Sequence, residues 1–180
     1  MKNWVILFAR TGSEGKLKGI LNENLNADEF LPFVPVKEMP YRRKGVVQEV
    51  RKPLFPGYVF IQTEIMPDLI ADKLEAALKN IEANEHIYSV LHYGNDKNDV
   101  VVREEERLHW ERLFDEDFCI KGSVGLVVGD AVRITSGALM GLESRIKKIN
   151  RHNREAVVEM KIMGAVREVA VMQEGTVEKN

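Results

Sequence analysis

The stretch Pro53–Gln62, PLFPGYVFIQ, predicts a tight turn that leads directly into a β-strand. Its Pro-Gly pair presets one backbone angle and frees the next, and the aromatic and β-branched residues that follow favour a strand. Alternate side chains of a strand point to opposite faces, so Val59 and Ile61 can hold a core while Tyr58 and Phe60 share the second face. Rings beneath a helix would be more core, whereas rings on an open face would mark a partner site. The residues alone leave both interpretations open.

Length and composition indicate a soluble protein with one domain or two small ones. The chain has 180 residues, of which 30% are charged. No apolar run approaches the roughly 20 residues of a membrane span, and the run Val5–Ala9 lacks the cleavage site of a signal peptide. We therefore expect a cytoplasmic protein with no membrane partner. The formal net charge is −2, but residues 124–180 hold 9 Lys and Arg against 7 Asp and Glu, so the end of the chain is its basic part.

Hydrophobic periodicity and turn residues predict an α+β fold. Before residue 118 the expected elements are a strand over 4–9, a helix after the N-cap candidate Ser13, an edge strand over 30–36, an antiparallel β unit over 39–62, a helix from Pro67, a strand over 87–93 and a helix over 103–114. We interpret residues 1–118 as the first domain and 119–125 as a linker. Only short strands follow, which predicts a small five-stranded β-barrel over residues 126–180.

Two groups of cations stand out in the sequence. The second predicted strand of the barrel and its turn carry Arg145, Lys147, Lys148, Arg151 and Arg154. The tip of the predicted β unit carries Arg42, Arg43 and Lys44. Each group could be a solvated face or a contact with RNA or DNA, and the residues alone do not decide. Strand alternation would place Arg145 and Lys147 on one face.

The motifs that identify common enzymes do not occur in the sequence. No glycine loop is followed by Lys-Ser or Lys-Thr, no His-Glu-x-x-His is found, and the histidines are scattered. Cys119, the only cysteine, follows Asp115–Asp117, whose negative charge raises a thiol pKa and weakens a nucleophile. We therefore expect no enzyme, no cofactor and no metal site.

Several motifs follow one another in a characteristic order. They are Trp4–Phe8 with Gly12–Glu14, the stretch Pro53–Ile61, and Val128–Ile134 with Gly137 and Gly141. In this order they resemble the NusG family of transcription elongation factors over nearly the whole chain, and the last resembles the KOW motif of the family's C-terminal barrel. Residues 137–144 and 163–169 depart from the pattern of ordinary members. The chain therefore resembles a specialised paralogue, and it is most similar to the LoaP group of antiterminators.

The resemblance implies a bacterial factor with an N-terminal NGN-like domain, in which helices flank a four-stranded antiparallel sheet. An apolar concavity of this domain would dock, as a monomer, on the clamp helices of the largest RNA polymerase subunit. The positions that match the family's docking surface are Phe8, Tyr58, Phe60 and Tyr93. Docking would hold the clamp closed and oppose pausing and termination, which is a shift of polymerase populations and not a chemical reaction.

A specialised paralogue also needs a recruitment signal. The LoaP group implies an RNA hairpin in the leader transcript, whose shape and phosphates the basic residues of the barrel would contact. The other route is the exposed non-template DNA strand, with Arg10, Arg42, Arg43 and Lys44 as candidates. Two further alternatives are a general elongation factor without sequence preference and a KOW-type RNA-binding module that acts in translation. The alternating pattern over residues 156–172 predicts strands, not a barrel stored as a helical hairpin.

Overall fold

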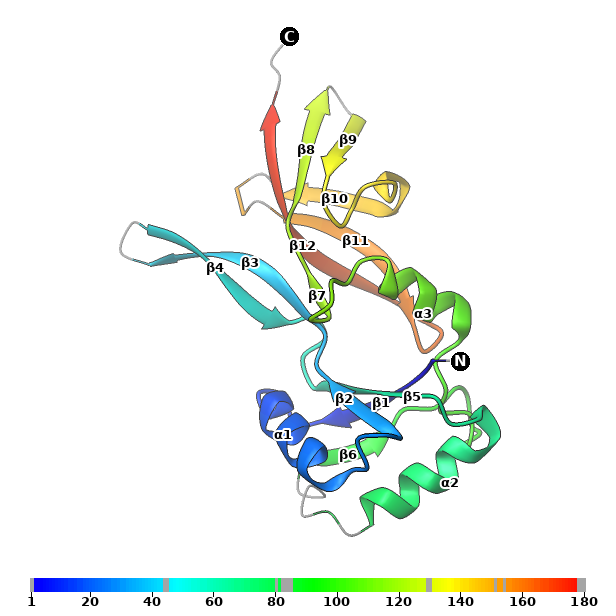
Figure 1. The fold of residues 1–180 in the computed structure, drawn as a ribbon. Helices are drawn as coiled ribbons and strands as arrows, with labels where there is room; N and C mark the ends of the chain where they lie inside the picture. The colour runs from blue at the N-terminus through cyan, green and yellow to red at the C-terminus, as the bar shows by residue number, and fades with distance from the viewer. Residues whose placement is uncertain are drawn as a thin grey trace. The chain divides into compact units, whose positions relative to one another are not determined.

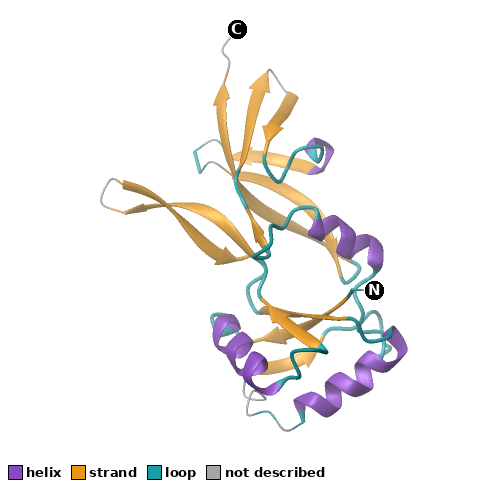
Figure 2. Ribbon diagram, in the orientation of Figure 1, coloured by secondary structure: helices purple, strands orange, loops and turns teal. Residues whose placement is uncertain are grey.

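The computed structural model describes residues 2–43, 46–79, 81, 86–128, 131–150, 152–153 and 155–177. The chain divides into two compact units (Figures 1 and 2). The first unit contains residues 1–35 and 55–108, and the second contains residues 36–54 and 109–180. None of the helices in the described ranges is long and apolar enough to cross a membrane.

The first unit is built on a four-stranded antiparallel sheet, as the family resemblance implied, and its strands lie in the order β2-β5-β1-β6. Its strands are β1 (Asn3–Ala9), β2 (Phe30–Phe33), β5 (Tyr58–Thr63) and β6 (Ile87–Val90). β1 and β5 pair without a break, from Asn3 opposite Thr63 to Phe8 opposite Tyr58. β2 lies at the edge of the sheet, where its Pro32 is tolerated because proline has no N–H for a ladder.

Two helices cover one face of this sheet (Figure 1). They are α1 (Glu14–Asn24) and α2 (Pro67–Leu78). Each buries a stripe of apolar residues at helical spacing, and the core they share with the sheet includes Val5, Leu7, Leu17, Leu21, Val59, Ile61, Ile70 and Leu74. Pro67 begins α2, where its missing N–H costs nothing, whereas Ser13 stands at the N-cap of α1 without a side-chain cap bond. A third helix, α3 (Glu104–Glu111), is shorter than the predicted 103–114.

The second unit contains a five-stranded sheet in the order β10-β11-β12-β8-β9 and a smaller sheet in the order β4-β3-β7. The larger sheet consists of β8 (Ser123–Val128), β9 (Ala131–Ser136), β10 (Ile146–Asn150), β11 (Glu155–Ile162) and β12 (Ala165–Val177). The smaller sheet consists of β3 (Val36–Arg43), β4 (Val46–Pro53) and β7 (Cys119–Ile120). β11 and β12 pair over residues 155–172, so the predicted strands there are confirmed.

Two segments lie elsewhere than the sequence indicated. The β unit expected over 39–62 divides, because β3 and β4 form a hairpin whereas β5 joins the sheet of the first unit. The stretch expected as a linker, 119–125, contains β7 and the start of β8, because Cys119 pairs with Val36 in a short parallel ladder. The two units therefore cut across the predicted domains 1–118 and 126–180, and that sequence-ordered division stays a prediction.

A tight turn at Gly137 packs against the start of β8, the first strand of the larger sheet in chain order. Gly137 has a φ of +96°, and a Cβ atom there would lie 2.5 Å from the Gly122 carbonyl oxygen and 2.6 Å from the Ser123 Cα atom. These neighbours are backbone atoms, so only glycine fits. The Ser123 hydroxyl also accepts a buried hydrogen bond of 2.9 Å from the Leu139 N–H, which ties the turn to β8.

Replacing Gly137 with alanine should lower the free energy of unfolding by more than about 2 kcal/mol, because a backbone clash adds to left-handed strain of about 1 kcal/mol. Gly141→Ala is the matched control, since Gly141 has a φ of +79° but no atom within 4 Å of an added Cβ. Urea unfolding of both variants measures the difference. Equal losses in the two variants would contradict the steric account.

Candidate functional site

Three aromatic side chains gather on the sheet face that is turned away from α1 and α2. Phe8 of β1 and Tyr58 of β5 form a direct cross-strand pair, with ring centroids 5.8 Å apart and ring planes at 86°. Tyr88 of β6 adds a third ring, whose centroid lies 5.4 Å from that of Phe8. Phe8 is 38% exposed and Tyr88 is 62% exposed. We call Phe8, Tyr58 and Tyr88 the aromatic face, and rings grouped and exposed in this way can bury a large apolar area against a partner.

Tyr88 was not among the docking positions that the family resemblance gave, and a β-bulge sets its place beside Phe8. Ser89 pairs with Phe8 and Ile87 pairs with Ala9, so Tyr88 is the extra residue between two successive pairs. A bulge re-aims the side chain of the extra residue. Simple alternation along the strand therefore could not place Tyr88 beside Phe8, because the bulge is a property of the pairing and not of the local sequence.

Phe60, a predicted docking residue, lies further along the same sheet face and is only 1% exposed. Its ring centroid lies 5.9 Å from that of Trp4, 5.3 Å from that of Phe33 and 6.0 Å from that of Phe55. Phe55 also contacts Tyr58, at 5.9 Å. Phe60 therefore belongs to a packed aromatic layer that continues from the aromatic face, and the structure does not place it among the exposed rings.

Tyr93, the fourth predicted docking residue, is not brought to the aromatic face by any described contact. Its hydroxyl donates to the Glu106 carboxylate at 2.9 Å and accepts from the Arg103 N–H at 3.0 Å. The Arg103 guanidinium also lies over its ring, 4.2 Å from the centroid. Burial, with the added effect of the Glu106 carboxylate, raises the pKa of Tyr93 to about 12 despite the opposing Arg103 N–H. These contacts tie the loop that carries Tyr93 to the first turn of α3.

The Pro-Gly turn before Tyr58 is fixed by Glu14 at the start of α1. The Gly57 N–H donates to Glu14 Oε1 at 2.6 Å, and the Gly57 carbonyl accepts from the Ala9 N–H at 2.7 Å. Gly57 has a φ of +84°, and an added Cβ would lie 3.0 Å from the Ala9 carbonyl oxygen and 3.3 Å from the Phe8 ring. The turn therefore needs glycine, and the position of the Phe8–Tyr58 pair depends on it.

Electrostatics at this turn favour the ionised form of Glu14, which is 4% exposed. Burial by itself would raise the pKa of this carboxyl. Backbone N–H donors, that of Gly57 first among them, outweigh burial and hold the pKa of Glu14 below its ordinary value. The charged carboxylate is therefore part of the folded arrangement.

A second candidate site lies in the second unit, where a short 3₁₀ turn, η2 (Glu143–Arg145), leads into β10. We call Arg145, Lys147 and Lys148 the basic turn. The prediction that Arg145 and Lys147 alternate along one strand is wrong, because Arg145 ends η2 and β10 begins after it. The register of β10 shifts between Ile146 and Lys148, and both lysines are exposed. The bulge thus presents two neighbouring ammonium groups to solvent.

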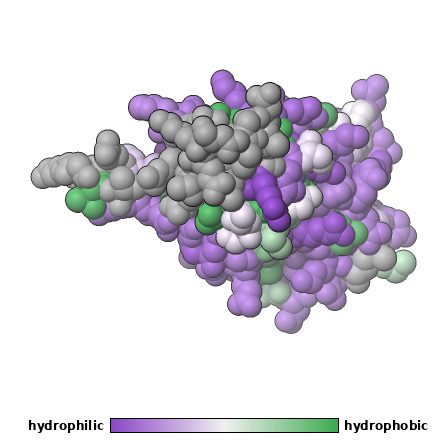
Figure 3. Space-filling view, turned by 90° about the horizontal axis from the view of Figure 1, so that it is seen from above, coloured by the Kyte–Doolittle hydropathy of each residue, from purple (hydrophilic) through white to green (hydrophobic). Residues whose placement is uncertain are grey.

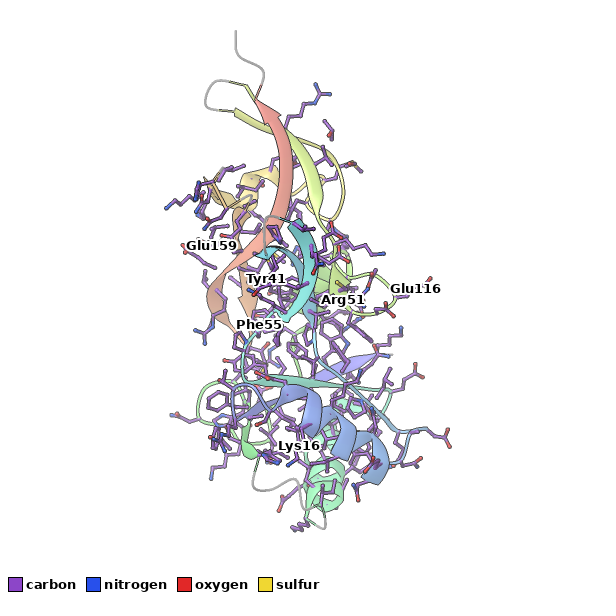
Figure 4. All side chains as sticks on the ribbon, turned by 90° about the vertical axis from the view of Figure 1, so that its left-hand side faces the viewer. Lys16, Tyr41, Arg51, Phe55, Glu116 and Glu159 are labelled. Carbon is purple, nitrogen blue, oxygen red and sulfur yellow. The ribbon has the colours of Figure 1, made fainter. Side chains whose placement is uncertain are left out.

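Contacts within the chain already engage part of the basic turn. Lys147 Nζ lies 3.1 Å from the carboxylate of Glu159 on β11, a residue labelled in Figure 4. The Arg145 guanidinium lies 3.2 Å from His109 Nε2 and 4.0 Å from Met160 Sδ. Lys148 enters no ion pair among the residues that the structure describes, so it is the cation of this set that is most available to a phosphate.

The other predicted nucleic-acid contacts are not gathered into one site. Arg10 is exposed after β1, and its N–H donates to the His86 carbonyl at 3.0 Å. Arg42 and Arg43 end β3, and nothing is described of their side chains. Lys44, Arg151 and Arg154 lie outside the described residues.

The face drawn in Figure 3 is mainly hydrophilic, with only small apolar patches among its coloured atoms.

Cys119 does not have the surroundings of a nucleophile. It is 0% exposed, and burial, followed by the Glu38 carboxylate, raises the pKa of its thiol. The raised pKa agrees with the sequence prediction, although burial and not the preceding acidic residues is its main cause. Within the described part of the chain, no three His, Cys, Asp or Glu side chains are grouped to hold a metal ion.

Glu14→Gln should lower the free energy of unfolding by about 1 kcal/mol at pH 7, because the variant keeps an acceptor but loses its charge. Since the folded state holds the pKa of Glu14 below its ordinary 4.5, the charge contributes above that pH and is lost as the pH falls through the lowered value. Chemical denaturation between pH 7 and pH 3 measures the gap between wild type and variant. The gap should shrink in acid, and a gap that stays constant would contradict this assignment.

Several known proteins resemble this chain in sequence. Residues 2–109 match the sequence model of the family described as "Transcription termination factor nusG". The transcription termination/antitermination protein NusG of Thermus thermophilus is 26% identical over 170 residues, which cover 89% of this chain and 90% of that protein. The protein of the same name from Streptococcus pyogenes serotype M1 is 25% identical over 181 residues, which cover 96% of this chain and 94% of that protein.

A solved structure shares the fold. It is described as "Domain interaction in Thermotoga maritima NusG", and it superposes with a TM-score of 0.54 and 20% sequence identity over 96% of this chain and 94% of that chain. At this identity the likeness concerns the fold alone. Because the family match spans residues 2–109, more than half of the 180 residues, the chain belongs to the NusG family.

Proposed function

We propose that this protein is a transcription factor that binds RNA polymerase during elongation and changes the outcome at terminators. The observation that carries the proposal is the aromatic face, in which Phe8 and Tyr88 are 38% and 62% exposed. The relatives from Thermus thermophilus and Streptococcus pyogenes are named transcription termination/antitermination proteins. Membership of their family supports the same kind of activity here, in the bacterial cytoplasm where transcription takes place.

The docking partner in this proposal is the pair of clamp helices on the largest polymerase subunit. A helical coiled coil presents a ridge of apolar side chains, and clustered rings give it a few dominant contacts. Phe8, Tyr58 and Tyr88 would make those contacts, Phe60 would support them from the packed layer, and Tyr93 would brace the loop before α3. The protein docks as a monomer, so one aromatic face serves one polymerase.

No bond is made or broken in the proposed mechanism. A factor that binds the closed-clamp polymerase more tightly than the open or paused form shifts the population toward the closed form. A tenfold difference in affinity between the two forms shifts their ratio tenfold, which corresponds to about 1.4 kcal/mol. The activity is therefore a difference of binding energies, and it needs neither a cofactor nor a catalytic residue.

We further propose that a nucleic-acid signal recruits the factor, and that an RNA hairpin in the leader transcript is that signal. The support is the basic turn, where Lys147 and Lys148 are exposed neighbours in sequence and Arg145 lies two residues before Lys147. Closely set cations suit the phosphates and shape of an A-form hairpin, whereas an aromatic platform would suit unpaired bases. These residues make the chain resemble a specialised antiterminator such as the LoaP group.

Phe8→Ala and Tyr88→Ala should each weaken binding to the polymerase core enzyme by roughly tenfold or more, because truncating a hot-spot ring costs on the order of 2 kcal/mol. Anisotropy of the labelled full chain, titrated with core enzyme, measures the affinity. Leu69→Ala is the matched control, since Leu69 is 47% exposed but belongs to α2 on the other side of the sheet. If the control loses as much affinity as the ring variants, the docking face is misplaced.

Lys148→Ala should weaken binding to a leader-RNA hairpin from the chain's own genomic neighbourhood and should reduce the slope of log K against log salt by about 1. The comparison uses a scrambled hairpin across a salt titration. Lys16→Ala is the control, because Lys16 is an exposed lysine on α1 in the first unit.

Equal and salt-labile binding to both hairpins would contradict recruitment by RNA. It would leave polymerase docking intact and favour either a general elongation factor or recruitment through non-template DNA. Arg10 is the first residue to test in that case, because it is exposed directly after Phe8 and Ala9.

A further inference from the structure

We propose that Arg145 is shared by two competing partners, the His109 side chain of α3 and a phosphate of the recruiting RNA. The inference rests on the proposed function, in which the basic turn binds an RNA hairpin. It adds a regulatory element that the proposed function does not contain, because RNA binding would have to break a contact with α3.

The geometry at Arg145 leaves little room for both partners. Nη2 of Arg145 lies 3.2 Å from His109 Nε2, and Nη1 donates toward Met160 Sδ at 4.0 Å. A guanidinium carries donors only, so Nε2 of His109 is the acceptor in a hydrogen bond between these two atoms. Each terminal nitrogen carries two N–H groups, and one on each already faces Met160 or His109. Arg145 is also half-buried, so a bidentate phosphate contact through both terminal nitrogens would compete with these two contacts for the orientation of the guanidinium.

Two further hydrogen bonds connect α3 and β3 to the β11–β12 hairpin. Trp110, next to His109, donates from Nε1 to the carbonyl of Lys161 at 2.8 Å. Lys37 of β3 donates from Nζ to the carbonyl of Ala170 at 2.6 Å. We call His109, Trp110 and Lys37 the clasp, since they attach α3 and β3 to the β11–β12 hairpin.

The clasp contacts stretches of β11 and β12 that, among the described residues, form a strand ladder on one side only. β10 pairs with β11 only over Glu155–Val158, and β8 pairs with β12 only over residues 173–177. Lys161 and Ala170 lie outside these ranges, so their carbonyls need other donors when buried. Trp110 and Lys37 supply those donors, and Trp110 is 1% exposed. The contact of His109 with Arg145 is the part of the clasp that a ligand of the basic turn can break.

Competition for one side chain makes the two contacts thermodynamically linked. The His109 contact lowers the affinity of the chain for RNA by a certain factor. Bound RNA must then lower the equilibrium constant of the His109–Arg145 contact by the same factor. The strength of one hydrogen bond sets the scale of that factor at about three- to tenfold. The leader hairpin would thus loosen the end of α3 as it binds.

The test compares His109→Ala with His109→Gln in the full chain, using the leader hairpin and its scrambled form as probes. His109→Ala releases Arg145 and should tighten binding to the leader hairpin by about three- to tenfold. His109→Gln keeps an acceptor oxygen and should stay within about twofold of wild type. His109 is only partly buried, so both variants should fold, and a thermal melt checks this. His92→Ala, at an exposed histidine of the first unit, controls for the loss of a histidine.

A second readout follows the helix itself. Adding the leader hairpin to the wild type should speed amide hydrogen exchange over residues 109–114, where the Leu113 N–H bonds the Trp110 carbonyl at 2.9 Å. In His109→Ala, which has no contact with Arg145 to lose, the hairpin should leave that exchange unchanged. An increase as large as in the wild type would contradict the inference.

The outcomes separate this inference from the function on which it rests. If wild type prefers the leader hairpin but His109→Ala binds it no more tightly, the shared arginine is refuted and RNA recruitment survives. If neither the wild type nor any variant binds the leader hairpin more tightly than the scrambled hairpin, the proposal of RNA recruitment is refuted, and this inference is refuted with it. Tighter binding by both His109→Ala and His109→Gln would also overturn the inference, because an acceptor at this position would then be irrelevant.

Discussion

The antiparallel register of β1 against β5 is the constraint on which the candidate docking surface depends. It sets Leu7 opposite Val59 beneath the helices and Phe8 opposite Tyr58 on the other side of the sheet. Gly57 anchors this register, because its backbone binds both β1 and the Glu14 carboxylate. A slip of one residue would send the rings into the helical core and the core residues outward. The turn at Gly57 thus contributes to the stability of the first unit and also determines which side chains form its aromatic face.

The two proposed surfaces use different physical effects, which suits the two tasks. Burial of Phe8 and Tyr88 is an apolar interaction that depends little on salt, as a contact kept throughout elongation requires. Attraction between the basic turn and phosphates is long-ranged but screened, so it can recruit without binding irreversibly. Internal partners moderate that charge, since Lys147 is paired with Glu159 and Arg145 contacts His109. The chain's small net charge of −2 agrees with a local rather than a general attraction to nucleic acid.

Local patterns predicted the elements well, because turn chemistry and alternation are properties of short stretches. The strand at Tyr58, the edge position of the strand with Pro32 and the start of α2 at Pro67 all followed from neighbouring residues. Features that depend on long-range pairing did not follow. Tyr88 reached Phe8 through a bulge, and the parallel ladder of Cys119 with Val36 placed a strand where a linker was expected. The family resemblance gave four docking positions, but it could not show which of these side chains make contacts within the chain instead of being exposed to a partner.

We propose that the aromatic face is where this chain meets RNA polymerase. The most direct test is amide hydrogen exchange of the full chain with and without polymerase core enzyme. We expect protection on binding to concentrate at the end of β1, the start of β5 and β6, which carry Phe8, Tyr58 and Tyr88. Protection confined to α2 or to the five-stranded sheet, with these three segments unchanged, would show that the polymerase binds elsewhere.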